Sequence, residues 1–189
     1  MKIESYHDTG KFLQMLSKES DRGCALIAAA AIDNRLAEAI GKHFVDNKDV
    51  SSKVLGQSGP LATFSARIDV GYLLGLYPLS THRDLHLMRK IRNEFGHVAE
   101  ELTFESAAIA GRCSELRSAV DIPVPGSRNR YVANLFFIIG TLDACIQKAV
   151  HLYEMKEVTD DERREANAIV ESGSFDTVRQ KLFASVARD

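Results

Sequence analysis

Apolar residues recur three and four positions apart through most of this chain, whereas alternation of apolar and polar residues over strand lengths is nearly absent. That spacing gathers apolar side chains on one face of a helix, as in the set Leu85, Met88, Ile91 and Phe95. The pattern predicts an all-α fold, a bundle of about six to eight helices.

Capping residues and helix breakers divide the periodic pattern into segments. We expect a short helix around Phe12, Leu13 and Leu16 and a central, alanine-rich helix, because small side chains permit close approach. Residues 47–59, polar with two glycines, are expected to connect two helices. The predicted longer helices cover residues 22–44, 60–76, 80–96, 104–120 and 131–156.

The C-terminal part of the chain differs from the rest. The predicted helix over 131–156 has an apolar seam that closes the bundle or forms a dimer seam. After it, Thr159 and Glu162 have capping-box spacing and open a charged helix. A last amphipathic helix carries Phe175, Val178, Leu182 and Val186. We therefore expect a helical-bundle domain over 1–156 and a helical appendage over 157–189, packed on or beside it.

Composition limits the classes of function. The chain of 189 residues has a formal net charge of −2. It therefore lacks the excess of basic residues that most direct nucleic-acid binders use. Its three cysteines are far apart, so neither a disulfide framework nor a zinc site is indicated. No apolar segment has the length or the position of a membrane span or a secretory signal, so we expect a cytoplasmic protein. Common catalytic signatures are absent.

The hexapeptide Arg92-Asn93-Glu94-Phe95-Gly96-His97 concentrates most of the potential chemistry. Gly96 is expected to end the helix and to place His97 at or past its C-terminal end. Two interpretations compete. In the structural one, Arg92 pairs with a buried carboxylate, Asn93 satisfies neighbouring backbone and His97 caps the helix. In the catalytic one, the arginine stabilises a phosphate and the histidine acts as acid or base.

Asp33 shares a helical line with Leu26, Ala29, Ala30 and Ala37, so its carboxylate faces at least partly into the packing. A buried charge without a partner is costly, so we expect Asp33 to pair with Arg67 or Arg92.

Two pairs of residues are spaced four apart. His82 and His86 could bind a metal through one helix face. However, no third ligand is evident, Asp84 points elsewhere and two solvent-facing histidines are expected, with no metal or cofactor. Gly71 and Gly75 have the spacing of close helix contacts, so we expect a packing role for them.

Four separated blocks resemble the mannitol operon repressor family: residues 19–23, the alanine-rich helix with Asp33, residues 60–68 and residues 89–97. The resemblance covers residues 12–116 well and the long later helix loosely, and Gly96 stands where the family pattern has alanine. The family's polar signature falls on Glu19, Asp21, Arg22, Asp33, Ser65, Arg67, Arg89, Arg92, Asn93 and His97.

The resemblance implies an all-helical bacterial transcriptional regulator, of a family named for repressing mannitol uptake and utilisation genes. We expect it to be a homodimer and to act through a protein partner in the regulation of carbohydrate uptake. No helix-turn-helix is visible, so direct DNA binding is not expected. That alternative requires Arg89, Lys90, Arg128, Arg130, Arg163 and Arg164 on one surface.

A second, shorter resemblance supports an enzyme alternative. The pattern of an arginine, a polar residue next to it and a histidine further along, on a helical bundle, is similar to that of HEPN-type ribonucleases. Arg92, Asn93 and His97 fit that spacing. This resemblance implies metal-independent RNA cleavage at a site paired across a dimer.

Overall fold

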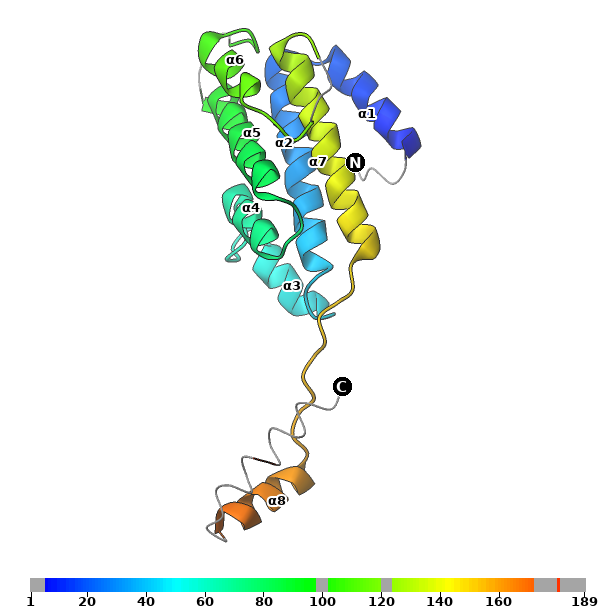
Figure 1. The fold of residues 1–189 in the computed structure, drawn as a ribbon, viewed down its shortest axis with the longest axis vertical. Helices are drawn as coiled ribbons and strands as arrows, with labels where there is room; N and C mark the ends of the chain where they lie inside the picture. The colour runs from blue at the N-terminus through cyan, green and yellow to red at the C-terminus, as the bar shows by residue number, and fades with distance from the viewer. Residues whose placement is uncertain (1–5, 98–101, 120–123, 172–179, 181–189) are drawn as a thin grey trace. The chain divides into compact units, whose positions relative to one another are not determined.

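The computed structural model of the chain describes residues 6–97, 102–119, 124–171 and 180, and in them it confirms the all-α prediction. Its contacts divide the chain into two units, Met1–Leu152 and Tyr153–Asp189. Within the described residues there is no β-strand beyond an isolated bridge between Val45 and Leu152. The described residues of the first unit form seven helices (Figure 1): α1 Tyr6–Lys18, α2 Asp21–Gly41, α3 Lys48–Leu55, α4 Phe64–Leu73, α5 Leu79–His97, α6 Ala107–Ser114 and α7 Ser127–Lys148.

Three helices of the first unit begin at side-chain caps. The side-chain oxygens of Ser20, Asn47 and Thr63 accept hydrogen bonds from the backbone N–H three residues later, at 3.0–3.1 Å. Each cap satisfies an N–H group that the first turn leaves without a partner. These local contacts fix the starts of α2, α3 and α4.

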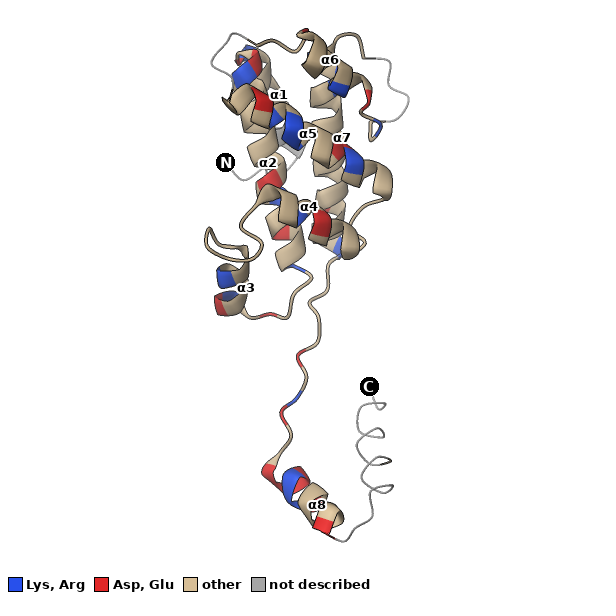
Figure 2. Cartoon of the chain, turned by 90° about the vertical axis from the view of Figure 1, so that its left-hand side faces the viewer, with Lys and Arg blue, Asp and Glu red and all other residues tan. Residues whose placement is uncertain are grey.

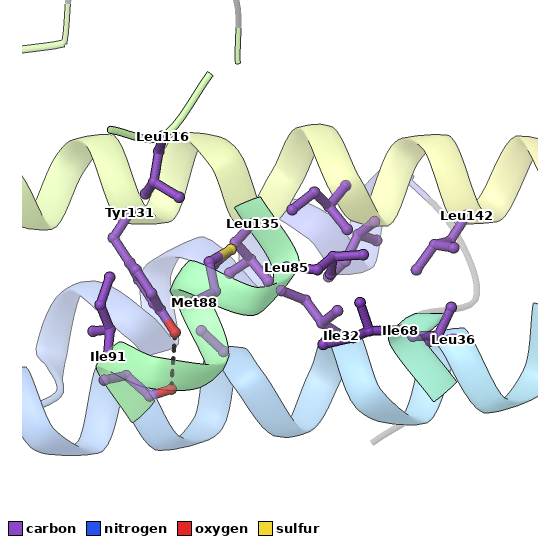
Figure 3. Close-up of a cluster of buried hydrophobic side chains, with 14 of the residues drawn as sticks. Ile32, Leu36, Ile68, Leu85, Met88, Ile91, Leu116, Tyr131, Leu135 and Leu142 are labelled. Atoms are coloured by element: carbon purple, nitrogen blue, oxygen red, sulfur yellow. Dashed lines mark hydrogen bonds between the residues drawn. The ribbon is translucent and has the colours of Figure 1, made fainter. Parts of the chain in front are cut away.

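Helix α2 lies at the centre of the bundle. It contacts α1, α3, α4, α5 and α7, and its small residues Ala25, Ala28 and Ala39 are completely buried. Small side chains let the neighbouring helices approach closely, as expected from the sequence. Figure 3 shows part of the core, in which α2 and α7 run alongside one another and Tyr131 donates a hydrogen bond to the carbonyl of Ala25 at 3.2 Å.

The apolar seam of α7 closes the bundle. Leu135, Ile139 and Leu142 are buried inside one chain, so the dimer-seam alternative is wrong for these residues. The helix also ends at Lys148, earlier than predicted, and Tyr153 is exposed outside it. The reason lies in tertiary contacts: residues 149–152 run beside the end of α2, where the ring of His151 hydrogen-bonds to the carbonyl of Phe44 at 2.7 Å.

Three other helix predictions need correction. The helix predicted over 60–76 is α4, which begins after the Thr63 cap and ends at Leu73. Residues 47–59 include helix α3, which the Asn47 cap starts and Gly56 ends. Helix α6 is shorter than the predicted 104–120. It stops because the buried carboxylate of Asp84 accepts the N–H groups of Arg117 and Ser118, at 2.7 and 2.5 Å, and these contacts turn the chain out of the helix.

The two glycines with helix-contact spacing have different roles. A Cβ on Gly71 would lie 2.6 Å from the Tyr77 hydroxyl and 2.9 Å from Leu36, so close packing requires this glycine, as expected. Gly75 has open space around it but a φ of 73°. It is needed for the left-handed turn after α4, so the packing prediction is wrong for Gly75.

The described part of the second unit contains helix α8, Asp160–Glu171. The capping box is confirmed: Thr159 donates its N–H to the carboxylate of Glu162 at 2.7 Å, and Glu162 donates its own N–H to the Thr159 hydroxyl at 3.3 Å. The predicted helix with Phe175, Val178, Leu182 and Val186 lies outside the described residues. None of the described helices has the length and apolarity needed to cross a membrane.

Candidate functional site

The expected ion pair of Asp33 is present, and its partner is Arg67. The guanidinium of Arg67, 9% exposed, donates from Nη1 to Asp33 Oδ1 at 2.8 Å. Its Nε and Nη2 donate to the carbonyls of Leu61 and Leu55, each at 2.8 Å. These contacts join α2 and α4 to the end of α3 and to the segment between α3 and α4. The Asp33–Arg67 ion pair therefore stabilises the fold.

Asp21, another signature residue, has a similar structural function. Its carboxylate accepts a hydrogen bond from Arg128 at 2.7 Å and one from the N–H of Phe104 at 2.8 Å. Arg128 also donates to the carbonyls of Leu16 and Glu19. The start of α7 is thus bound to the junction of α1 and α2, and Arg128 is engaged within the chain.

The hexapeptide does not follow the expected structural arrangement. Helix α5 continues through Gly96 to His97, so this glycine does not interrupt it. Arg92 is exposed and donates to the side chain of Asn93 at 3.0 Å, so its predicted pairing with a buried carboxylate is wrong. Glu94 pairs with Arg112 of α6.

The catalytic interpretation of the hexapeptide also lacks a formed site. The side chains of Arg92 and His97 are both exposed, and no contact joins them among the described residues. The nearby Arg89 has its Nε buried without a hydrogen-bond partner in the described part of the chain. Ser65 is half-buried in α4, and Arg22 is exposed near the start of α2. The signature is thus divided between fold-stabilising pairs and surface residues.

An open groove of about 710 Å³ lies between the α4–α5 turn and the outer face of α7. One side is formed by Leu74, Gly75 and Leu76, and the other by residues of α7 that include Phe137 and Cys145. His43 and Lys148 also line it. The sequence pattern did not identify this groove, because its two sides are about 60 residues apart in the chain.

Large apolar side chains remain exposed at and beside this groove. Phe137 is 47% exposed on α7, and Leu73 and Leu79, which flank the α4–α5 turn, are 80% and 56% exposed. The Cys145 thiol donates to the carbonyl of Leu76 at 3.1 Å, and burial raises its pKa above the ordinary value. Exposed apolar side chains of this kind are suited to contact another protein.

In the cartoon of Figure 2, the Lys and Arg positions of the first unit are interspersed with Asp and Glu positions along its helices. Of the arginines that direct DNA binding would need, Arg128 is engaged with Asp21, and Arg130 donates to the carbonyl of Ser114 at 3.2 Å. Arg163 and Arg164 belong to the second unit. The arrangement of the first unit therefore gives direct DNA binding no support.

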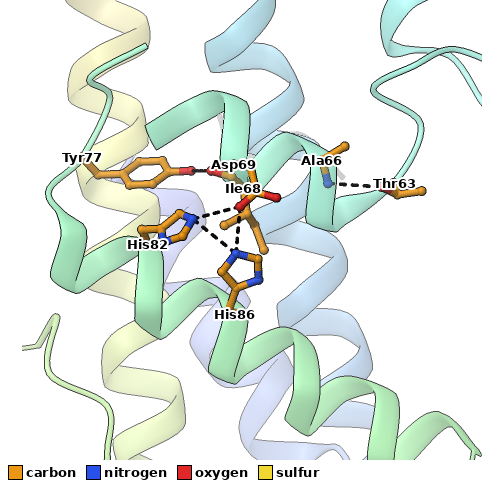
Figure 4. Close-up of polar contacts among 7 residues, drawn as sticks. All are labelled: Thr63, Ala66, Ile68, Asp69, Tyr77, His82 and His86. Carbon is orange, nitrogen blue, oxygen red and sulfur yellow. Dashed lines mark hydrogen bonds and ion pairs between the residues drawn. The ribbon is translucent and has the colours of Figure 1, made fainter. Parts of the chain in front are cut away.

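His82 and His86 are half-buried and meet a third polar group, contrary to the expectation of two solvent-facing histidines (Figure 4). Asp69 of α4 lies with its Oδ1 2.9 Å from Nε2 of His82 and 3.0 Å from Nε2 of His86. The hydrogen bond from His82, with that from His86, lowers the pKa of Asp69 despite some opposing desolvation. As predicted, Asp84 points elsewhere, to the backbone after α6.

The burial of several polar side chains, among them Asp84 and Asn134, was not predicted from the sequence. Asp84 is 1% exposed, and so is Asn134, which accepts the N–H of Ala119 at 2.9 Å. Both sit at positions where their helices also carry buried apolar residues. A polar residue at such a position in the sequence indicates a buried polar group, which needs a hydrogen-bond partner.

Comparisons with known proteins give a family match and a similar fold. A family model described as "Mannitol repressor" matches residues 25–138. A solved structure described as the X-ray structure of the MtlR–HPr complex from Escherichia coli has a chain that is similar, with a TM-score of 0.54 and 21% sequence identity. The similarity covers 74% of this chain and 96% of that one. No curated protein sequence matches.

Proposed function

This chain belongs to the mannitol repressor family, and on that premise we propose that it regulates carbohydrate-uptake genes in the cytoplasm by binding a protein partner, without enzymatic activity of its own. The groove between the α4–α5 turn and α7 carries the proposal, because apolar side chains border it and few charges line it. Interfaces of this kind are depleted of charge at their centre and anchored by aromatic residues.

HPr is the partner to test first, because the similar solved chain was described in a complex with HPr. Phe137 is the natural anchor of such a contact. It is exposed, aromatic and borders the groove, so a partner that covers it removes a large apolar area from water. Lys148, the one lysine or arginine among the groove-lining residues, suits a carboxylate or another anion at the edge of the partner.

We also propose that the regulator is a homodimer. Because the seam of α7 is buried within one chain, the dimer contact must use another surface. Sedimentation equilibrium measures this directly, and a mass independent of concentration at that of one chain, 20.9 kDa, contradicts the dimer.

The partner is tested with Phe137→Glu and a matched control, Val50→Glu, which places the same charge on α3 at a residue 54% exposed. We expect the full chain to bind purified HPr, and Phe137→Glu to weaken binding at least about tenfold, or about 1.4 kcal/mol. Val50→Glu leaves the affinity within about twofold. The measurement is isothermal titration calorimetry, with circular dichroism to verify folding.

The same variants test regulation in the cell. In a strain lacking this protein, the mannitol-operon transcript should rise without mannitol, and restoring the wild type or Val50→Glu should return it to the repressed level. Phe137→Glu should not. A transcript unchanged by the deletion contradicts the proposal that the protein regulates this operon. Repression by Phe137→Glu as strong as that by the wild type contradicts the proposal that the groove binds the partner.

The ribonuclease alternative receives no support from the family or from the geometry at Arg92 and His97. Its decisive measurement is incubation of the purified protein with single-stranded RNA without metal. Intact RNA is the expected result. If the wild type cleaves the RNA and the folded His97→Ala variant does not, the ribonuclease alternative is supported.

A further inference from the structure

Three potential metal ligands from two helices converge on one point. The Oδ1 of Asp69 and the Nε2 atoms of His82 and His86 form a triangle with sides of 2.9, 3.0 and 3.3 Å. Asp69 comes from α4, and the two histidines lie one turn apart on α5. In Figure 4 all three side chains point toward one another.

Hydrogen bonding explains two sides of this triangle and not the third. If both imidazoles donate an Nε2–H to Asp69, neither retains a lone pair at Nε2 to accept a proton from the other. The 3.3 Å contact between the two Nε2 atoms is then a contact between two donors. A cation that receives a lone pair from each of the three atoms removes this conflict.

The size of the triangle matches a transition-metal site. Around a tetrahedral zinc ion with bonds of about 2.0–2.1 Å, two ligand atoms lie about 3.3 Å apart. The observed separations of 2.9–3.3 Å are within a few tenths of an ångström of that value. An ion about 1 Å above the plane of the three atoms is therefore about 2 Å from each, and no helix has to move.

The surroundings hold the ligands in place and leave one side open. The ring of Tyr72 packs on His82 with the centroids 4.9 Å apart, and the two histidine rings meet edge to face at 4.6 Å. The histidine side chains are 20% and 24% exposed, and that of Asp69 is 55% exposed. Solvent thus has access to the point where the three ligands converge.

We propose that Asp69, His82 and His86 form a zinc-binding site with three protein ligands and a fourth position open to water or to a partner's side chain. Imidazole and carboxylate ligands suit zinc, and soft sulfur ligands are not needed. The ion joins α4 to α5 across the turn that contains Leu74, Gly75 and Leu76, which form one side of the groove. The site does not depend on which partner the groove binds.

The test uses the full chain without an affinity tag, stripped of metal by dialysis against a chelator. Zinc affinity is measured by competition with a chromophoric chelator, and Co²⁺ serves as a visible probe of coordination. We expect one equivalent to bind, and His86→Ala and Asp69→Asn each to weaken the affinity at least about tenfold. The matched control is His97→Ala, an exposed histidine at the other end of α5, which should leave it unchanged.

A second measurement is thermal unfolding. A metal that binds the folded chain raises its unfolding temperature, so zinc should raise it for the wild type and His97→Ala and not for Asp69→Asn. If His86→Ala fails to fold, Asp69→Asn decides, because this isosteric change is at a largely exposed side chain. The proposal is overturned if the wild type binds no stoichiometric metal, or if both ligand variants bind like the wild type.

Discussion

At the scale of the residue, burial determines what each charged group does. Asp33 lies partly within the packing of α2, and Arg67 supplies the opposite charge while its other nitrogens bind two carbonyls. Arg92, the other candidate, is exposed. A charge kept from water requires a partner, whereas an exposed charge is stabilised by solvent. The Asp33–Arg67 pair therefore has a structural role in the fold.

We predict that Asp33→Ala lowers the free energy of unfolding by about 1–3 kcal/mol, because it leaves part of a buried guanidinium without an acceptor. The control is Glu38→Ala on the same helix. Glu38 is 39% exposed, and its partner Arg35 keeps a second carboxylate, Asp143, so the cost should stay below about 1 kcal/mol. Urea unfolding measures both changes, and equal losses would contradict the assigned role of the pair.

At the scale of the element, close helix contacts decide where a side chain can be added. Gly71 allows α4 to lie against Leu36 of α2 and against Tyr77, whose hydroxyl is fixed by a 2.7 Å hydrogen bond to the carbonyl of Ile68. Gly96 is also inside a helix, but a Cβ there would lie 3.9 Å from Leu26, an ordinary contact. The alanine of the family pattern fits at this position without any movement.

The two glycines give opposite predictions for the same change. Gly71→Ala should destabilise the protein by about 1–3 kcal/mol, because the added methyl displaces fixed neighbours. Gly96→Ala should stabilise it by about 0.5–1 kcal/mol, since alanine loses less conformational freedom in a helix. Thermal unfolding with circular dichroism measures both. Stabilisation by Gly71→Ala would show that the contact with Tyr77 relaxes easily.

At the scale of the whole molecule, the described core belongs to the first unit. Its members run from Phe12 to Leu142, with Ile146 packed against them, and the groove also lies in this unit. Helix α8 has no buried residue. We propose that residues 1–156 are a domain that folds without the appendage over 157–189.

Truncation after Lys156 tests this division. We expect the shortened chain to unfold cooperatively, with a midpoint within about 4 °C of the full chain, which corresponds to about 1 kcal/mol at this size. Binding of HPr should be retained, because the groove is intact. Aggregation of the truncated chain, or a much lower midpoint, would show that the C-terminal unit contributes to folding of the bundle.

The sequence by itself determined the helical class, the approximate positions of most helices and the need of Asp33 for a cationic partner. These follow from local rules, since periodicity, caps and the cost of burying a charge act within one element. Four separated blocks also predicted the family, which the match over residues 25–138 confirms.

Only the tertiary structure decided that Arg67 is the partner, that the seam of α7 faces its own core and that Asp69 meets His82 and His86. Tertiary contacts also make α6 and α7 end earlier than the sequence predicts, and they form the groove. Each of these depends on which helix faces which, through contacts between residues far apart in the chain. Local spacing indicates which side of a helix is buried, whereas the packing of the helices selects the neighbour.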